Sequence, residues 1–168
     1  FHMFKEKTIQ INQTPLLSAI ENEDLDAVNL LLSHPKIDVN IKSTKDIRYK
    51  YIFYNRSNKE KNNFSKFLHE RKTPLWAANI TKNFDLVKLL LTNDDIEINA
   101  QSIIINNFPH FFIKYNHMSI DLEDHLITLK NISEMTYQST EEITDPFKLA
   151  IGQNNNDILN LLNSKKDK

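Results

Sequence analysis

The same pattern of apolar positions occurs twice along this chain. Thr14-Pro15-Leu16 is followed by a leucine triplet at 30–32 and by an Ile-Asp-Val-Asn sequence that ends at Asn40. Thr73-Pro74-Leu75 is followed by the same arrangement, with leucines at 89–91 and an Ile-Glu-Ile-Asn sequence that ends at Asn99. Thr and Asn lie 26 residues apart in both copies. Such a repeat predicts supersecondary units that bury their apolar faces by stacking on one another.

A third, weaker copy begins at Asp145-Pro146-Phe147 and continues with Leu149-Ala150 and the doublets at 158–159 and 161–162. Thr or Asp before Pro predicts a helix start in each copy. The side-chain oxygen caps free backbone N–H groups, and Pro occupies the first helical position, where its missing N–H costs nothing. Helical periodicity with few breakers therefore predicts a mainly α protein.

These copies resemble the ankyrin repeat, whose unit reads T-P-L-H-x-A-A, then G-H, then [IV]-V-x-L-L-L and a turn that ends in D-V-N. The resemblance implies a helix-turn-helix solenoid of three repeats, at 14–40, 73–99 and 145–163, in a single domain over residues 1–168. We expect helix pairs at Pro15 to Asn22 with Leu25 to Ser33, Pro74 to Thr81 with Phe84 to Thr92, and Pro146 to Gln153 with Asn156 to Asn163. The expected core comprises Leu16, Ala19, Val28, Leu31, Leu75, Ala78, Val87, Leu90, Leu149 and Leu161.

The repeats depart from the family pattern where glycine usually separates the two helices. Glu23 and Lys82 stand there, and the only glycine of the chain, Gly152, lies two positions early in the third copy. A helix end that needs a positive φ usually employs Gly. We therefore expect Asn83 and Asn155 to supply the positive φ, or the turns to adopt another geometry.

The signature histidine is also missing. Leu17, Trp76 and Lys148 occupy its position. In the family this histidine supplies a hydrogen bond that ties neighbouring units together, and we therefore expect modest stability.

Two long insertions, 41–72 and 100–144, separate the copies. The starts of the copies lie 59 and 72 residues apart, against about 33 in an ordinary array. Both insertions follow the Asn of the turn, where the family projects a loop or β-hairpin finger. Long loops inside a domain are usually functional or disordered, so we look for function there first.

The first insertion is basic and aromatic, with ten Lys or Arg against three Asp or Glu, while the whole chain has a net charge of −1. Residues 47–54 alternate as a strand does, residues 55–58 predict a turn, and residues 63–69 form either a short helix or a second strand. The aromatic groups either cover the base of the finger or contact a partner, which is a protein or, with bases stacked on the rings, a nucleic acid.

The second insertion is acidic, with six Asp or Glu against two Lys. Residues 102–105 and 111–113 predict a hairpin around a loop at 106–110. Leu122, Leu126, Leu129 and Ile132 predict a helix, which is either a decoration or part of a degenerate fourth repeat. The opposed charges would also allow the two insertions to lean on each other.

Catalytic signatures are missing from the sequence. The six histidines include no pair at helical i, i+3 or i, i+4 spacing, one glycine forms no phosphate loop, and there are no cysteines. We therefore predict no catalytic, cofactor-binding or metal-binding residues. No apolar run is long enough to cross a bilayer and no signal peptide begins the chain, so we expect an intracellular, cytoplasmic protein.

The resemblance implies a non-enzymatic module or scaffold that binds a protein partner, without membrane insertion. Tyr and Arg dominate interface hot spots, so the candidate contacts are Arg48, Tyr49, Tyr51, Tyr54 and Arg56, followed by Trp76 and Ile80 on the first helix of the second repeat. Trp76 occupies the histidine position, so it is as easily buried between units.

Two alternatives remain open from the sequence. In the first, insertion 41–72 binds nucleic acid or an acidic partner, with an affinity that falls steeply with salt. In the second, the chain is a structural segment of a longer repeat array, as apolar Phe4, Ile9 and Ile11 before the first repeat suggest.

Overall fold

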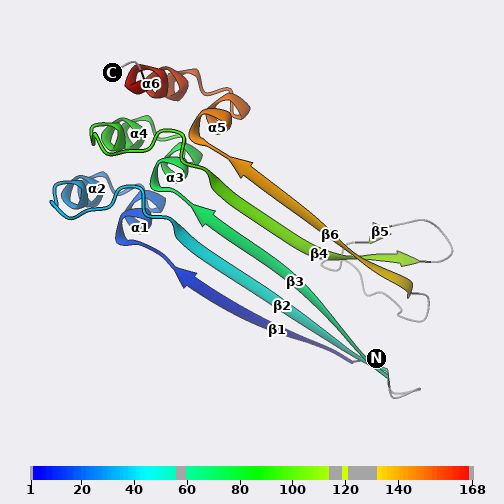
Figure 1. The fold of residues 1–168 in the computed structure, drawn as a ribbon. Helices are drawn as coiled ribbons and strands as arrows, with labels where there is room; N and C mark the ends of the chain where they lie inside the picture. Colours follow the sequence, from blue (N-terminus) through cyan, green and yellow to red (C-terminus); the bar gives the residue numbers. More distant parts are fainter. Residues whose placement is uncertain (1, 56–59, 114–118, 121–131, 167–168) are drawn as a thin grey trace. The chain divides into compact units, whose positions relative to one another are not determined.

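Three helix pairs alternate with long strands along the described chain (Figure 1). The structure, a computed structural model, describes residues 2–55, 60–113, 119–120 and 132–166, with side chains described for 4–52, 65–107 and 139–166. The helices are α1 (Pro15–Glu21), α2 (Leu25–Leu32), α3 (Pro74–Ile80), α4 (Phe84–Leu91), α5 (Pro146–Gly152) and α6 (Asn156–Lys166). The strands are β1 (His2–Asn12), β2 (Ser43–Asn55), β3 (Glu60–Lys72), β4 (Ser102–Ile113), β5 (Ser119–Ile120) and β6 (Ile132–Thr144).

The prediction of a mainly α solenoid was wrong, because the insertions form a sheet. Its strands follow the order β1-β2-β3-β4-β5, and β6 also pairs with β4. Five of them have 11 to 13 residues, whereas the helices have 7 to 11. Side-chain alternation in 47–54 predicted a strand correctly, but β2 extends beyond this stretch at both ends, from Ser43 to Asn55.

The predicted hairpin at 102–113 was also wrong, since β4 runs unbroken through the expected loop. Strand β4 has β3, β5 and β6 as partners, and Phe111 and Phe112 pair antiparallel with Ile120 and Ser119. Pairing with neighbours thus outweighs the local turn preference of Asn and Pro. Most of the helix expected after residue 121 lies outside the described residues, and Ile132 is the first residue of β6.

Contacts divide the chain into two compact units. The strand unit comprises the described parts of 1–9, 46–68 and 105–141, and the helical unit those of 10–45, 69–104 and 142–168. How these units are joined decides whether residues 1–168 form one domain, so that expectation stays a prediction.

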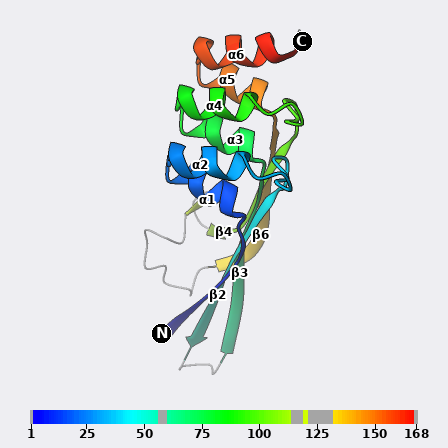
Figure 2. The same cartoon turned by 90° about the vertical axis from the view of Figure 1, so that its left-hand side faces the viewer.

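In the helical unit the first helices α1, α3 and α5 contact one another in sequence, and so do the second helices α2, α4 and α6 (Figure 2). The six helices begin within one residue of where the sequence placed them. Of the expected core, seven residues are buried, and Leu31, Leu149 and Leu161 pack against it partly buried. Apolar periodicity therefore predicted this unit's interior well.

Helix starts also follow the prediction. Thr14, Thr73 and Asp145 cap α1, α3 and α5, because their side-chain oxygens accept hydrogen bonds from the backbone N–H three residues later. Pro follows each cap at the first helical position. The same start signal thus sets the same local geometry in all three copies.

Polar contacts join neighbouring copies at their turns. The amide of Asn40 donates to the Asp95 carbonyl oxygen at 2.7 Å and accepts from the Glu97 N–H at 2.9 Å. Buried Asn79 of α3 donates to the Pro146 carbonyl oxygen at 2.6 Å. Lys165 Nζ of α6 donates to the Asn93 carbonyl oxygen and pairs with Asp94 at 2.9 Å. Each copy is thereby tied to the next through backbone groups as well as apolar packing.

The interhelical turns adopt positive φ without glycine. Glu23, Lys82 and Asn154 have φ angles of 55°, 59° and 53°. The expectation that Asn83 and Asn155 would supply this conformation was wrong, because their side chains instead cap α4 and α6 by accepting from the N–H groups three residues later. Each turn therefore separates the two tasks, with positive φ at one position and the cap at the next.

We predict that Lys82→Gly raises the free energy of unfolding by about 0.5–1 kcal/mol. A left-handed backbone costs an L-residue about 1–2 kcal/mol, part of which the larger unfolded-state entropy of Gly offsets. Lys82 is exposed, so the substitution removes no buried contact. Urea unfolding measures the change, and Lys82→Ala, which keeps the Cβ atom, is the matched control with no gain expected. Equal stability of the two variants would contradict the strain.

Candidate interaction site

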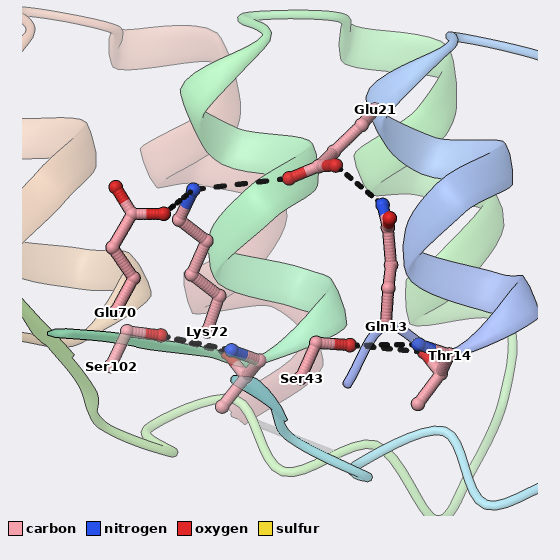
Figure 3. Close-up of polar contacts among 8 residues, drawn as sticks. Gln13, Thr14, Glu21, Ser43, Glu70, Lys72 and Ser102 are labelled. Atoms are coloured by element: carbon pink, nitrogen blue, oxygen red, sulfur yellow. Dashed lines mark hydrogen bonds and ion pairs between the residues drawn. The ribbon is translucent and has the colours of Figure 1, made fainter. Parts of the chain in front are cut away.

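Two serines make equivalent hydrogen bonds to the threonines that begin the first two repeats (Figure 3). Ser43 Oγ, at the start of β2, accepts the Thr14 N–H at 3.0 Å, and Ser102 Oγ, at the start of β4, accepts the Thr73 N–H at 3.0 Å. The two serines follow their threonines by 29 residues in both copies. These hydrogen bonds join the helix start to the outgoing strand. They stabilise the repeat in the absence of the signature histidine.

A polar cluster lies next to these serines in the helical unit (Figure 3). Gln13 donates to Glu21 at 2.7 Å, Lys72 Nζ lies 3.8 Å from the other oxygen of Glu21, and Lys72 also pairs with Glu70 at 2.9 Å. The Lys72 ammonium lies 6.0 Å from the centre of the Trp76 ring. The side chains of Lys72 and Glu70 are 21% and 16% exposed, so water screens this pair less than a surface pair.

A cavity of about 80 Å³ opens beside the polar cluster. Its lining consists of Ile11, Gln13, Leu17, Glu21, Ser43, Thr44, Lys45, Glu70 and Lys72. A drug-sized ligand needs roughly 300–1,000 Å³, whereas a water needs only about 10–15 Å³. The size suits a few waters, and the cluster is best explained as a structural link between α1 and β3.

In the strand unit, the side chains of β1 and β2 form a basic aromatic face. Lys5 Nζ lies 4.8 Å from the ring centre of Tyr49 and 5.5 Å from that of Tyr51, and Lys7 Nζ lies 5.5 Å from Tyr49. The two rings stack with centres 6.4 Å apart. Tyr51 is buried and Tyr49 is half-buried, while both lysines are exposed. Tyr51 thus holds the Tyr49 ring in place by stacking, and the Tyr49 ring in turn makes cation–π contacts with both lysines.

The alternate residues of β2 make a second set of contacts. The Arg48 guanidinium lies 5.3 Å from the Phe67 ring centre, and Lys50 pairs with Glu6 at 3.9 Å. Because successive side chains in a strand point to opposite faces, these residues are separated from Tyr49 and Tyr51 by the backbone. Basic groups therefore lie on both faces of β2.

The structure brings together only some of the residues proposed from the sequence. Arg48, Tyr49 and Tyr51 share β2, whereas the side chain of Tyr54 and the whole of Arg56 lie outside the described part. In α3, Trp76 is buried and Ile80 is 44% exposed.

Sequence reasoning missed Lys5, Lys7, Ser43 and Ser102. The serines had a usable signal, since their 29-residue distance from the capping Thr is the same in both copies. The lysines had a weaker signal, the alternation of Lys with polar residues in 5–8, which does not reveal that β2 is the neighbouring strand.

We predict that Ser102→Ala lowers the free energy of unfolding by about 1–3 kcal/mol. Thr73 and Ser102 are both buried, so the substitution leaves a buried N–H without its acceptor. Ser43→Ala should have a smaller effect, because the equivalent pair is only partly buried. Ser164→Ala, which removes an exposed hydroxyl of α6, is the control that should change stability by less than about 0.5 kcal/mol. Thermal and urea unfolding provide the values, and equal losses at Ser102 and Ser164 would contradict this role.

The described ranges hold no candidate for two other kinds of site. No three His, Cys, Asp or Glu side chains in these ranges gather as metal ligands would. Among the helices described, none combines the length and apolarity needed to cross a membrane.

Comparison with known families bears out the resemblance over two stretches. The ankyrin repeat model matches residues 12–44 and 70–103. A comparison with curated proteins finds no match, and neither does one with solved structures. Ankyrin repeats generally mediate protein–protein interaction and are typically non-enzymatic. The third copy lies outside the match, although α5 and α6 repeat the capping and turn geometry. The chain therefore contains two stretches that match the ankyrin repeat, at residues 12–44 and 70–103.

Proposed function

We propose that this chain is a non-enzymatic module that binds a protein partner through the basic aromatic face of β1 and β2. Binding of a protein partner is supported by the two stretches that match the ankyrin repeat, because such repeats generally mediate protein–protein interaction. The fold alone does not name the surface, which must be argued from the side chains.

Lys5, Lys7 and Tyr49 are the contacts that we propose first. Tyr49 offers a large ring that is held in place by stacking on Tyr51, so little side-chain freedom is lost on binding. Two ammonium groups lie within cation–π distance of that ring. Tyr51 and Trp76 are buried and are not part of the proposed contact set.

The charges favour a partner with an acidic surface. Insertion 41–72 has ten basic and three acidic residues, and Lys5 and Lys7 on β1 add two cations beside Tyr49. Complementary charge raises the rate of encounter and disfavours wrong partners. A base that stacked on Tyr49 would compete with both lysines for its ring, which favours an acidic protein over nucleic acid. Exposed Ile80 is a secondary candidate contact on the helical unit.

We predict that the triple variant Lys5→Ala, Lys7→Ala, Tyr49→Ala loses the partners that the unchanged chain captures from a nuclease-treated cell lysate. For a purified partner, the dissociation constant should rise roughly tenfold or more, as the loss of hot-spot groups implies. The affinity should also fall as salt rises, because exposed charges are screened.

The matched control replaces the same types of residue on α4. Phe84→Ala with Lys88→Ala removes an exposed aromatic and an exposed cation from the helical unit and should leave capture unchanged. Circular dichroism establishes that all variants are equally folded. Partners that the triple variant retains but the α4 variant loses would contradict the proposed surface. Capture of nucleic acid alone, before nuclease treatment, would contradict the protein-binding function.

A further inference from the structure

Strand β1 is the last strand of the sheet order, and β2 is its one neighbour among the described strands (Figure 1). Residues 4–9 are the part of β1 that belongs to the strand unit and has described side chains, and every one of them is exposed. Backbone groups of a strand face its two sides alternately, so only every second residue bonds to β2. The intervening N–H and C=O groups of 4–9 therefore form an edge that can accept another strand.

The two faces of this edge differ in charge. Lys5 and Lys7 lie on the face that carries the Tyr49 ring, and neither ammonium has a carboxylate partner among the described residues. Glu6, between them in the sequence, lies on the other face, where it pairs with Lys50 at 3.9 Å. The face of the edge that carries Tyr49 is therefore positively charged, and its two cations are available to an anionic neighbour.

This charge pattern decides which kind of strand fits the edge. Side chains directly opposite each other on neighbouring strands lie about 5 Å apart, so opposite charges attract and like charges repel there. A second copy of β1, paired antiparallel about Glu6, would place each lysine opposite a lysine. A strand with acidic residues at alternate positions would instead place a carboxylate beside both Lys5 and Lys7. It would also cover Phe4 and Ile9, which are 61% and 47% exposed.

We propose that the edge of β1 at 4–9 binds an extended acidic segment of the protein partner as an additional strand. Backbone hydrogen bonds to the open edge supply the affinity, and the side chains at alternate positions supply the specificity. The acidic side chains pair with Lys5 and Lys7, and the residues between them lie beside Phe4 on the other face. This proposal rests on the proposed function, because it specifies how the partner reaches the basic aromatic face.

Hydrogen exchange of the full chain, followed residue by residue by NMR, tests the proposal with a synthetic peptide. The probe is a capped peptide of about ten residues in which Glu and Val alternate, a length typical of strands. In the free chain, the N–H groups of 4–9 that face away from β2 should exchange fast. We expect the peptide to slow exchange at these groups by roughly tenfold or more, because it becomes their hydrogen-bond partner. A peptide of the same composition, with Glu and Val in separate blocks, should bind roughly tenfold more weakly or worse.

A charge reversal tests the specificity of the edge. Lys5→Glu with Lys7→Glu should raise the dissociation constant of the Glu/Val peptide roughly tenfold or more, and should allow a Lys/Val peptide to bind instead. Lys88→Glu with Lys166→Glu is the matched control, because it changes the net charge equally at exposed positions of α4 and α6. This control should bind the Glu/Val peptide as the unchanged chain does. Circular dichroism establishes that the variants are equally folded.

Three results would overturn strand addition at β1. One is binding of the Glu/Val peptide that depends on Lys5 and Lys7 but leaves exchange of the N–H groups in 4–9 unchanged. Another is equal affinity for the alternating and the block peptide, or no binding of either. The third is protection of these N–H groups by self-association without peptide, which would assign the edge to a second copy. The first result leaves the proposed function standing, whereas retention of lysate partners by the triple variant contradicts that function whatever the peptide does.

Discussion

The hydrogen bond from the Thr73 N–H to Ser102 Oγ is the interaction on which the second repeat depends. Thr73 must cap α3 with its hydroxyl, and its own N–H is buried beside the strand that leaves the repeat. Leaving this buried N–H without a partner would lower the free energy of unfolding by about 1–3 kcal/mol. Ser102, the first residue of β4, accepts this N–H, so a hydrogen bond holds the start of α3 to the outgoing strand.

The ties between copies extend this logic from one repeat to the next. Asn40 satisfies a carbonyl and an N–H of the following turn, and Asn79 satisfies the Pro146 carbonyl of the following first helix. Apolar packing alone would let neighbouring helices slide, since it is not directional. Directional bonds to backbone groups fix the register between neighbouring copies.

The sequence predicted the local helix starts well, but it predicted the pairing of the strands poorly. Pro15, Pro74 and Pro146 marked helix starts correctly, because a cap followed by Pro is a short-range signal. The sheet was underestimated, because β3 and β6, which both pair with β4, are remote from it in the sequence, and an alternation of side chains does not identify the partner strand. For the candidate site, Tyr49 was found by residue type, but the lysines of β1 beside it became visible only once the neighbour of β2 was known.

Native-state hydrogen exchange of the unmodified chain tests the central claim, that the repeats are joined through specific backbone groups, most directly. The account predicts slow exchange at the N–H groups of Thr73 and Glu97, which Ser102 and Asn40 accept, and fast exchange at the Asp38 N–H. Glu97 and Asp38 hold equivalent positions in their repeats, so each serves as the reference for the other. Equally fast exchange at Glu97 and Asp38 would contradict the account, because the two turns would then be alike.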